Sequence, residues 1–332
     1  MKIFKFFFVI NLFFSSIYAF GQDNEFNAWK EKFKIYAEKQ GISKKILNET
    51  IEKSIFLPDV IKYDRYQPEF YEDTKTYISK RTSKSKVKKG IKLYSQNNNL
   101  IDKVSKIYKV DKNLLLSLMG IETNFGTYLG KMDIISSLAT LSYDKRRSEF
   151  FSSELITLLK LLDQKIVDKN TLYGSWAGAY GNFQFMPSTI KSYAVDYNQN
   201  KKIELKKLED SFASAANYLN SLGWDNKKPC FYKINLVENV PLNYLNTSAK
   251  KLKNKKKIKY LKKYIKNSKF LNKYDDIKGA LITPDVDIIP DTNKFEPAYI
   301  VFDNYELILK WNRSLRFALA VCTLKEKFNN DL

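Results

Sequence analysis

The chain has 332 residues, 57 of them basic and 36 acidic, and a formal net charge of +21. It contains no histidine, which excludes a Ser-His-Asp triad, a Cys-His pair and any histidine-ligated metal site. The excess of positive charge indicates a polyanionic partner or surface, although overuse of Lys, Asn, Ile and Tyr is also what a biased genome produces. With 44% hydrophobic and 15% aromatic residues, the chain has enough apolar material for two compact domains, or for one domain with appendages.

The first 21 residues are typical of a secretory signal peptide. Lys2 and Lys5 precede an apolar run over residues 6–14, and Ala19-Phe20-Gly21 has the small-x-small pattern of a cleavage site. The run is too short to span a membrane, and the alternative is an uncleaved anchor. No cysteine follows the apolar run, so we expect an exported protein that is not a lipoprotein.

Helical spacing dominates the next part of the chain. Apolar residues at steps of three and four predict an amphipathic helix over residues 26–40, ended by Gly41, and a second helix that begins at Ser43. The segment 63–70 is expected to be an extended linker, and residues 72–108 return to helical spacing. The stripe expected to be buried there consists of Leu100, Ile101, Val104, Ile107 and Tyr108.

An apolar helix with one carboxylate is predicted next. Asp111 is the expected N-cap, and Asn124 and Gly126 are expected to end the helix. Glu122 follows Leu118 by four residues, so its side chain lies in line with the apolar stripe. Lost hydration would raise the pKa of this carboxyl, and a carboxyl that keeps its proton near neutral pH can act as a general acid. The alternative is that Glu122 only borders the core.

A loop rich in glycine and aromatic residues, GSWAGAYGNFQFMPST, begins about fifty residues later at Gly174. Flat aromatic faces beside hydroxyl and amide groups suit a sugar. Its candidate binding residues are Ser175, Tyr180 and Gln184. Between this loop and the apolar helix, a further helix is expected around residues 134–141. The pair Arg146-Arg147 then precedes an apolar helix, and the usual role of such a pair is to solvate a helix start.

The segment 196–207 resembles an EF-hand loop only in part. Asp196, Asn198 and Asn200 stand at loop positions one, three and five. Lysines occupy positions six and twelve, where a glycine and an acidic residue are expected. We therefore expect no metal here and predict that the segment persists as a turn.

Beyond a helix expected over residues 211–222, the composition changes. Residues 231–236 alternate like a strand. Residues 250–273 hold 12 lysines and no acid, which predicts either an amphipathic helix with a basic face or a solvated, partly mobile insertion. The apolar positions Ile258, Leu261 and Ile265 lie on one side of that stretch.

The last predicted element is a single helix with a capping-box-like start at Asp303 and Glu306. It is expected to carry Trp311 and to run through Cys322. The only other cysteine is Cys230, and a disulfide between the two is possible in an oxidising compartment. Because Cys322 stands in an apolar run, a buried core position is favoured over a disulfide.

Five groups of motifs, in the same order along the chain, resemble the lytic murein transglycosylase B family. Each is weak alone, but together they cover most of the chain. They are Asp64-Arg-Tyr-Gln-Pro-Glu-Phe70, Gly120-Ile-Glu-Thr-Asn-Phe-Gly126, Ser136-Ser-Leu-Ala-Thr-Leu-Ser142 with Arg146-Arg147, Gly174 to Ser188, and Asn304-Tyr305 with Lys310-Trp-Asn-Arg-Ser314.

The resemblance implies a mainly α (α+β) protein with a lysozyme-like catalytic core. We expect a signal peptide over residues 1–21, an N-terminal helical portion over 22–100 and the catalytic core over 101–225. A small lysine-rich insertion with short strands is expected over 226–296, and a C-terminal helix that packs back on the core over 297–332.

The resemblance also implies an enzyme that cuts the β-1,4 bond between N-acetylmuramic acid and N-acetylglucosamine without water, leaving 1,6-anhydromuramic ends. Glu122 would protonate the glycosidic oxygen and then, as a carboxylate, take the proton of the C6 hydroxyl. Most glycosidases need two carboxylates, and substrate-assisted enzymes are the exception. The residues implied to line the glycan cleft are Arg146, Arg147, Ser175, Tyr180, Gln184, Tyr218, Trp311 and Asn312. The family often has tyrosine where Phe150 and Trp311 stand.

Two alternatives stay open. A lysozyme-type hydrolase would use Glu122 with a second carboxylate, for which Asp133 and Asp144 are the nearby acids, and a non-catalytic wall-binding protein would not need Glu122. The expected partners are peptidoglycan glycan strands and, through the basic insertion, an anionic membrane or wall surface. We expect a periplasmic location, no cofactor, no metal and no nucleic acid.

Overall fold

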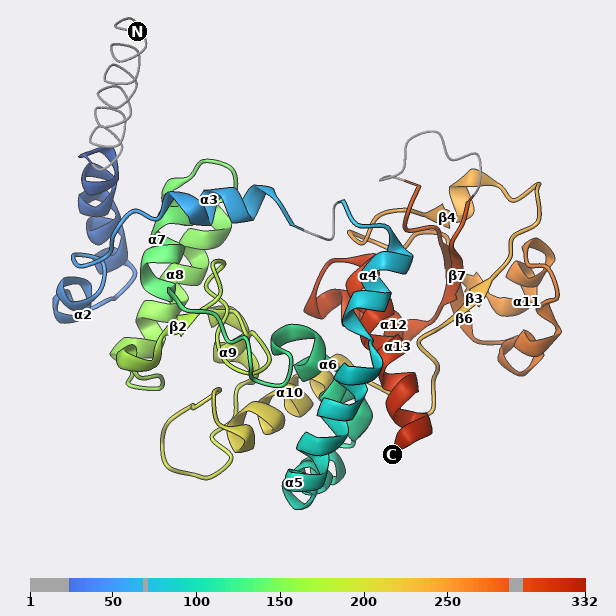
Figure 1. Cartoon of the computed structure of the whole chain (residues 1–332). Coiled ribbons are helices and arrows are strands. Elements are labelled where there is room, and N and C mark those ends of the chain that lie inside the picture. Colours follow the sequence, from blue (N-terminus) through green and yellow to red (C-terminus); the bar gives the residue numbers. More distant parts are fainter. Residues whose placement is uncertain (1–23, 68–70, 287–294) are drawn as a thin grey trace, which may run out of the picture. The chain divides into compact units, whose positions relative to one another are not determined.

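The computed structural model describes residues 24–67, 71–286 and 295–332 (Figure 1). The predicted signal peptide lies outside these residues, as do the last three residues of the Asp64 motif. The chain forms two compact units. The first consists of the residues up to Arg65, Leu129–Ser192 and Gln199–Glu204, and the second of Tyr66–Tyr128, Tyr193–Asn198 and Leu205–Leu332. In the described ranges, no helix is long and apolar enough to cross a membrane.

The first unit is built from helices around α7 and α8, with one short strand pair. Its elements are a helix over residues 24–39, α2 (Lys44–Glu49), α3 (Pro58–Arg65), β1 (Met132–Asp133), α7 (Ile134–Tyr143), α8 (Ser148–Asp163), the 3₁₀ turn η2 (Lys169–Thr171), β2 (Tyr173–Gly174) and α9 (Pro187–Tyr193). Strands β1 and β2 pair antiparallel, with Met132 opposite Gly174. This pair therefore fixes where the glycine-rich loop begins.

The early helices of this unit follow the sequence closely. The helix over 24–39 ends before Gly41, and Ser43 caps α2 by accepting a hydrogen bond from the backbone N–H of Ile46 over 3.3 Å. The predicted extended linker over 63–70 is wrong at its start, because α3 continues to Arg65. Asp64 is buried in α3 and pairs with Arg146 and Arg147.

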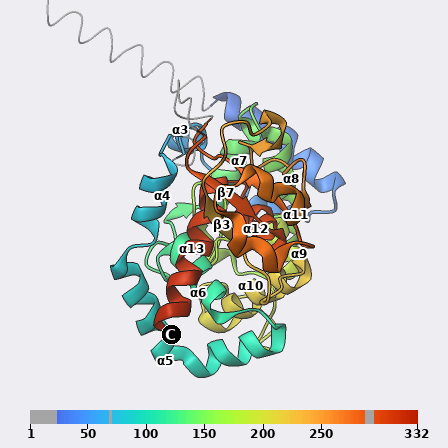
Figure 2. The same ribbon diagram turned by 90° about the vertical axis from the view of Figure 1, so that its right-hand side faces the viewer.

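The second unit contains the longer helices. They are α4 (Thr74–Arg81), α5 (Lys84–Tyr108), α6 (Lys112–Thr123), α10 (Leu208–Leu222), α12 (Asp303–Trp311) and α13 (Leu315–Asp331). Helix α13 packs against α6 and α4, and α5 packs against α6 and α10 (Figures 1 and 2). Ile101 and Val104 are fully buried as predicted, but Ile107 is 52% exposed, so the predicted stripe ends one turn too late.

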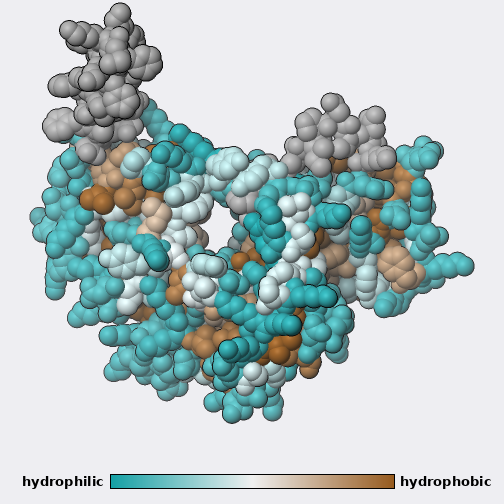
Figure 3. Space-filling view, in the orientation of Figure 1, coloured by the Kyte–Doolittle hydropathy of each residue, from teal (hydrophilic) through white to brown (hydrophobic). Residues whose placement is uncertain are grey.

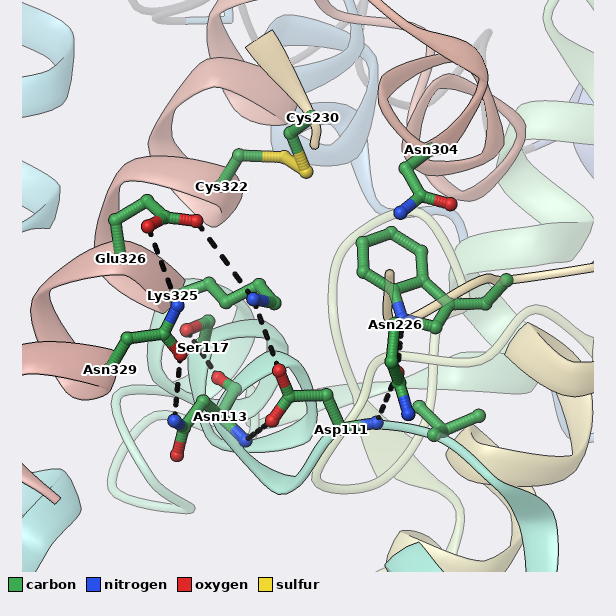
Figure 4. A network of polar contacts seen from close by, with 12 residues as sticks. Asp111, Asn113, Ser117, Asn226, Cys230, Asn304, Cys322, Lys325, Glu326 and Asn329 are labelled. Atoms are coloured by element: carbon green, nitrogen blue, oxygen red, sulfur yellow. Dashed lines mark hydrogen bonds and ion pairs between the residues drawn. A yellow bond between two sulfur atoms is a disulfide. The ribbon is translucent and has the colours of Figure 1, made fainter. Parts of the chain in front are cut away.

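The first turn of α6 is fixed by polar contacts with α13 and with the chain after α10 (Figure 4). Asp111 caps α6 as predicted, accepting from the backbone N–H of Asn113 over 2.9 Å. The same carboxylate lies 3.0 Å from the ammonium of Lys325, and the amide of Asn113 donates to Asn329 over 2.8 Å. Four leucines and Met119 are buried along the rest of α6. Helix α6 is therefore held at its start and along its length.

A small mixed sheet follows α10 in the chain. Its strands are β3 (Phe231–Ile234), β4 (Leu245–Asn246), β5 (Lys256–Lys257), β6 (Lys278–Ile282) and β7 (Ala298–Val301). The order is β3-β7-β6-β4, with β5 also paired to β6, and only the β4–β6 pair is parallel. The predicted strand at residue 231 is confirmed as β3.

The lysine-rich segment does not form the predicted single amphipathic helix, and most of its lysines are exposed, as the alternative of a solvated insertion expects. It folds as β5, the one-turn helix α11 (Ile258–Leu261), and the 3₁₀ turns η4 (Lys262–Tyr264) and η5 (Ser268–Tyr274). Ile258, Leu261 and Ile265 do lie on one side, and they are buried in the core beneath the sheet. The prediction of one amphipathic helix fails because these side chains pack against residues far along the chain rather than along one helix face.

The predicted single C-terminal helix is two helices. The backbone of Asn312 is extended, and Ser314 caps α13 by accepting from the N–H of Phe317 over 3.1 Å. The predicted capping box is also wrong: Asp303 and Glu306 lie inside α12 and both pair with Lys255 of the lysine-rich segment.

The two cysteines form a disulfide between the start of the sheet and α13 (Figure 4). Cys322 is fully buried, as its apolar neighbours predict. The expectation that it is a core cysteine rather than a bridged one is corrected, because the two Cα atoms lie 6.2 Å apart and the sulfurs are bonded.

Candidate active site

Glu122 is placed by the abrupt end of α6. Asn124, Phe125 and Gly126 all have positive φ, at 50°, 59° and 77°, so the chain turns away directly after the last helical turn. Gly120 permits this turn, because a Cβ there would lie 2.7 Å from the ring of Phe125. Glu122 is half-buried in this last turn, as predicted.

The carboxylate of Glu122 is held by an aromatic side chain from α12. The indole N–H of Trp311 donates to its Oε1 over 3.0 Å. The Trp311 ring stacks on Tyr218, with centroids 5.0 Å apart, and Tyr218 stacks on Tyr193 at 4.4 Å. Burial raises the pKa of Tyr218, so its hydroxyl keeps its proton, and it donates to the carbonyl of Lys310 over 3.3 Å. Three stacked rings therefore support the acid.

A pocket of about 390 Å³ opens beside Glu122 within the second unit. It is lined by Ser83, Ser85, Lys86, Lys89, Ile121, Glu122, Asn124 and Tyr128. The ammonium of Lys86 donates to the carbonyl of Gly120 over 2.7 Å, which ties α5 to the turn before Glu122. Burial, followed by the charges of Arg81 and Lys89, lowers the pKa of Lys86 to about 8.

The glycine-rich loop lies in the first unit and is closed by its own hydrogen bonds. Tyr180 and Phe185 pair as an isolated bridge, and Ser175 accepts from the N–H of Ala179 over 3.0 Å. The Gln184 amide donates to the carbonyl of Gly181 over 2.9 Å. Tyr180 is only 3% exposed, and its hydroxyl lies 3.0 Å from that of Thr171. Tyr180 therefore contributes mainly to the packing beneath the loop.

The Arg146-Arg147 pair surrounds a buried carboxylate. Arg146 donates from Nε to Asp64 over 2.8 Å, and Arg147 pairs with the other carboxylate oxygen. The Asp64 side chain is 1% exposed, whereas the two arginines keep 45% and 40% of their side-chain surface. The two arginines therefore do more than solvate the start of a helix, because the buried carboxylate of Asp64 fixes both of them.

The candidate second carboxylates have structural partners. Asp133 caps α7, accepting from the N–H groups of Ile135 and Ser136 and from the Ser136 hydroxyl. Asp144 pairs with Arg65 over 2.9 Å. In the segment 196–207, Asn200 donates to Glu204 over 2.7 Å, and the backbone N–H of Tyr197 donates to Asp210 over 2.9 Å.

The predicted site residues are divided between the two units. Glu122, Tyr218, Trp311 and Asn312 belong to the second unit, and Arg146, Arg147, Ser175, Tyr180 and Gln184 to the first. Contacts within the second unit bring Glu122, Trp311 and Tyr218 together. Asn312 ends α12 directly after Trp311.

Sequence reasoning missed three contributors near the acid: Tyr193, Lys86 and Lys89. None carries a local signal. Tyr193 ends a short helix, and the two lysines belong to a helix with many exposed lysines. Asp64 could be recognised in the sequence as the first residue of a motif. Its pairing with two arginines about eighty residues away could not be predicted.

The fold of this chain is that of a known protein family. The family model described as transglycosylase SLT domain matches residues 25–326, so the chain belongs to that family. Membrane-bound lytic murein transglycosylase B of Escherichia coli K12 is 37% identical over 149 residues, which are 45% of this chain and 41% of that protein. The chain therefore aligns with less than half of the length of that relative.

Two solved structures are similar over nearly the whole chain. SltB3 from Pseudomonas aeruginosa, solved with NAG-anhNAM-pentapeptide, has a TM-score of 0.79 at 28% identity, covering 92% of this chain and 79% of that one. The Escherichia coli lytic transglycosylase Slt35, solved with calcium, has a TM-score of 0.73 at 25% identity, covering 93% and 94%. The predicted family resemblance and the mainly helical, lysozyme-like fold are confirmed.

Proposed function

We propose that the protein is a peptidoglycan lytic transglycosylase, which cuts the β-1,4 bond between N-acetylmuramic acid and N-acetylglucosamine without water. The observation that carries this proposal is the carboxylate of Glu122, which accepts a hydrogen bond from Trp311 in the last turn of α6, in a residue that lines a pocket. Family membership and the relatives solved with muropeptides support the substrate class.

In this mechanism one carboxyl acts twice. Protonated Glu122 gives its proton to the glycosidic oxygen as the bond to C1 breaks. The resulting carboxylate takes the proton of the C6 hydroxyl, and the C6 oxygen closes on C1 to form the 1,6-anhydro ring. An indole N–H can donate but cannot accept, so Trp311 holds Oε1 of Glu122 as a hydrogen-bond donor and takes no proton from the acid.

The remaining site residues are proposed to bind the glycan. The stacked rings of Tyr218 and Trp311 suit the apolar face of a sugar, and Asn312, Ser175 and Gln184 offer hydrogen bonds to hydroxyl and acetamide groups. Arg146 and Arg147, each about two-fifths exposed, are proposed to meet the acidic peptide stems. Tyr180, being buried, is proposed to act by shaping the loop.

A lysozyme-type hydrolase is the second candidate, and it needs a base to activate water. Both oxygens of Asp133 accept hydrogen bonds at the start of α7, which supports a capping role rather than a base. A substrate acetamide in place of the second carboxylate is therefore favoured.

The experiment is the digestion of purified sacculi by the wild-type protein and by Glu122→Gln. We expect the substitution to abolish the release of muropeptides while sedimentation with sacculi continues, because Gln keeps the shape of the side chain but cannot transfer a proton. Undiminished release by Glu122→Gln would rule out the proposed acid.

We propose export to the periplasm and a contact between the lysine-rich segment and an anionic membrane or wall surface. Four lysines of the segment, Lys255, Lys257, Lys259 and Lys262, pair with acidic side chains. Among the described residues, the other eight have no carboxylate within ion-pair distance, and all eight are exposed: Lys250, Lys251, Lys253, Lys256, Lys263, Lys266, Lys269 and Lys273.

Hydrophilic residues cover much of the surface around α11 in Figure 3. Since Ile258, Leu261 and Ile265 are already buried in the core, the proposed contact is electrostatic and does not insert apolar side chains. We propose the same domain boundaries as those expected from the sequence, and we propose that the segment 226–296 is the insertion that binds the surface.

A further inference from the structure

The pocket beside Glu122 carries an excess of positive charge at its rim. Of its eight lining residues, Lys86 and Lys89 are cationic and only Glu122 is acidic. Ser83 and Ser85 add two hydroxyl groups, whose oxygens lie 2.9 Å apart. A pocket that combines two ammonium groups with hydroxyl donors is suited to a carboxylate.

Lys86 is held in this pocket at an energetic cost. Its ammonium is half-buried, and Arg81 and Lys89 act on it as like charges. Its one described hydrogen bond, to the carbonyl of Gly120, uses a single N–H of the three. In the described part of the chain, no carboxylate lies within ion-pair distance of Lys86 or Lys89. A charge kept in this position without a fixed counter-ion favours an anion supplied from outside.

The first turn of α5 adds to this cost. Ser83 caps the helix, and the turn that follows contains Lys84 and Lys86 but no acidic residue. Cations at this end oppose the helix dipole, where acidic side chains are usually favourable. The position of Lys86 in the first turn of α5 therefore gives its charge no favourable interaction with the helix dipole.

We propose that Lys86 and Lys89 form a subsite that binds a carboxylate of the peptide stem on the muramic acid being cleaved. This inference rests on the proposed function, and it names the part of the substrate that the pocket recognises. The stem is attached to the same sugar whose bond Glu122 would break, so a pocket lined by Glu122 is a suitable place for its first carboxylates. Arg146 and Arg147 belong to the other unit and already share Asp64.

The test compares two substrates and two sets of lysines. The substrates are glycan strands with intact stems and the same strands stripped of their stems by an amidase, with the lactyl carboxyl that this hydrolysis exposes blocked as its amide. The variants are Lys86→Gln with Lys89→Gln and, as a matched control, Lys84→Gln with Lys88→Gln, which changes two exposed lysines of the same helix that do not line the pocket. Lys86→Arg keeps the charge and serves as the conservative variant.

We expect the double pocket variant to lose on the order of tenfold more in kcat/KM on stem-bearing strands than on stripped strands, the effect of a lost charge-assisted hydrogen bond, because any loss of the Lys86 bond to the carbonyl of Gly120 affects both substrates alike. Lys86→Arg should keep most of the stem preference, and the control should be unchanged on both substrates. Equal losses on both substrates would overturn the subsite. Absence of cleavage of both substrates by the wild-type protein would overturn the proposed function with it.

Discussion

The indole N–H of Trp311 donates to Oε1 of Glu122 over 3.0 Å and thereby joins the end of α12 to the end of α6. The two residues are 189 positions apart in the chain. A tyrosine at this position could make a corresponding bond with its hydroxyl, but a hydroxyl can also accept, whereas an indole only donates. This chain therefore assigns one oxygen of the acid to a fixed donor.

Replacing Trp311 by Phe should lower kcat by roughly ten- to a hundredfold, the effect of removing a hydrogen bond to a charged group. The aromatic stack with Tyr218 remains in this variant, so KM should change little. Trp311→Tyr is the matched control and should recover most of the activity. If Trp311→Phe and Trp311→Tyr have the same kcat, the donated hydrogen bond has no role in catalysis.

The stem preference should depend on pH through Lys86, whose pKa is lowered to about 8. Lys89, Glu122 and Tyr128 line the same pocket, and Arg81 acts on Lys86 as a further like charge. Below pH 8 the ammonium is charged and binds a carboxylate; above it the preference for stem-bearing over stripped strands should fall. The ratio of the two kcat/KM values from pH 6 to pH 9 measures this, and a ratio that stays constant contradicts it.

Unfolding of the protein at high pH would not explain a fall in the preference for stem-bearing strands. A lysine with a lowered pKa in the folded state binds fewer protons than in the unfolded chain between about pH 8 and its ordinary pKa of 10.5. The contribution of Lys86 to stability therefore rises with pH across that window and is constant below it. A melting curve at pH 9 checks that the protein remains folded.

The disulfide should contribute strongly to stability because it closes a loop of 92 residues. The loss of chain entropy in the unfolded state predicts about 4–5 kcal/mol. Urea unfolding of the oxidised and the reduced wild-type protein measures the bond alone, since reduction keeps both sulfur atoms in the core. Identical midpoints before and after reduction would show that the bond does not stabilise the fold.

Neutralising four exposed lysines of the lysine-rich segment, Lys263, Lys266, Lys269 and Lys273, to Gln should weaken binding to anionic vesicles by a hundredfold or more, from about 1 kcal/mol per lysine. The matched control replaces Lys84, Lys88, Lys92 and Lys106, which are exposed on α5. Cosedimentation with phosphatidylglycerol vesicles, phosphatidylcholine vesicles and sacculi separates membrane from wall. If the four substitutions leave binding to every one of these surfaces unchanged, the lysine-rich segment is not the contact.

Local rules in the sequence predicted the parts of the site that depend on local structure. Asp111 caps α6, Asn124 ends it, and Glu122 lies in its last turn; each of these features is set by residues only a few positions away from it. The break between α12 and α13 was missed although Ser314 is a good N-cap, because Trp311 and the residues around it continue a helical pattern.

Features that depend on distant packing could not be predicted. The burial of Lys86 depends on a carbonyl 34 residues away, and the disulfide depends on the meeting of the sheet with α13. The lysine-rich segment has an apolar spacing that suits a helix, yet its buried residues pack into a core formed mostly by the sheet. In each case the tertiary environment decided between conformations that the local sequence permits equally.

The most direct test of the account is the mass of the muropeptides that the wild-type protein releases from purified sacculi. If Glu122 alone performs both proton transfers and the C6 oxygen closes on C1, every released muramic end is one water lighter than an ordinary reducing end. Release of products with ordinary reducing ends would show that water is the nucleophile and would contradict the mechanism with a single carboxyl.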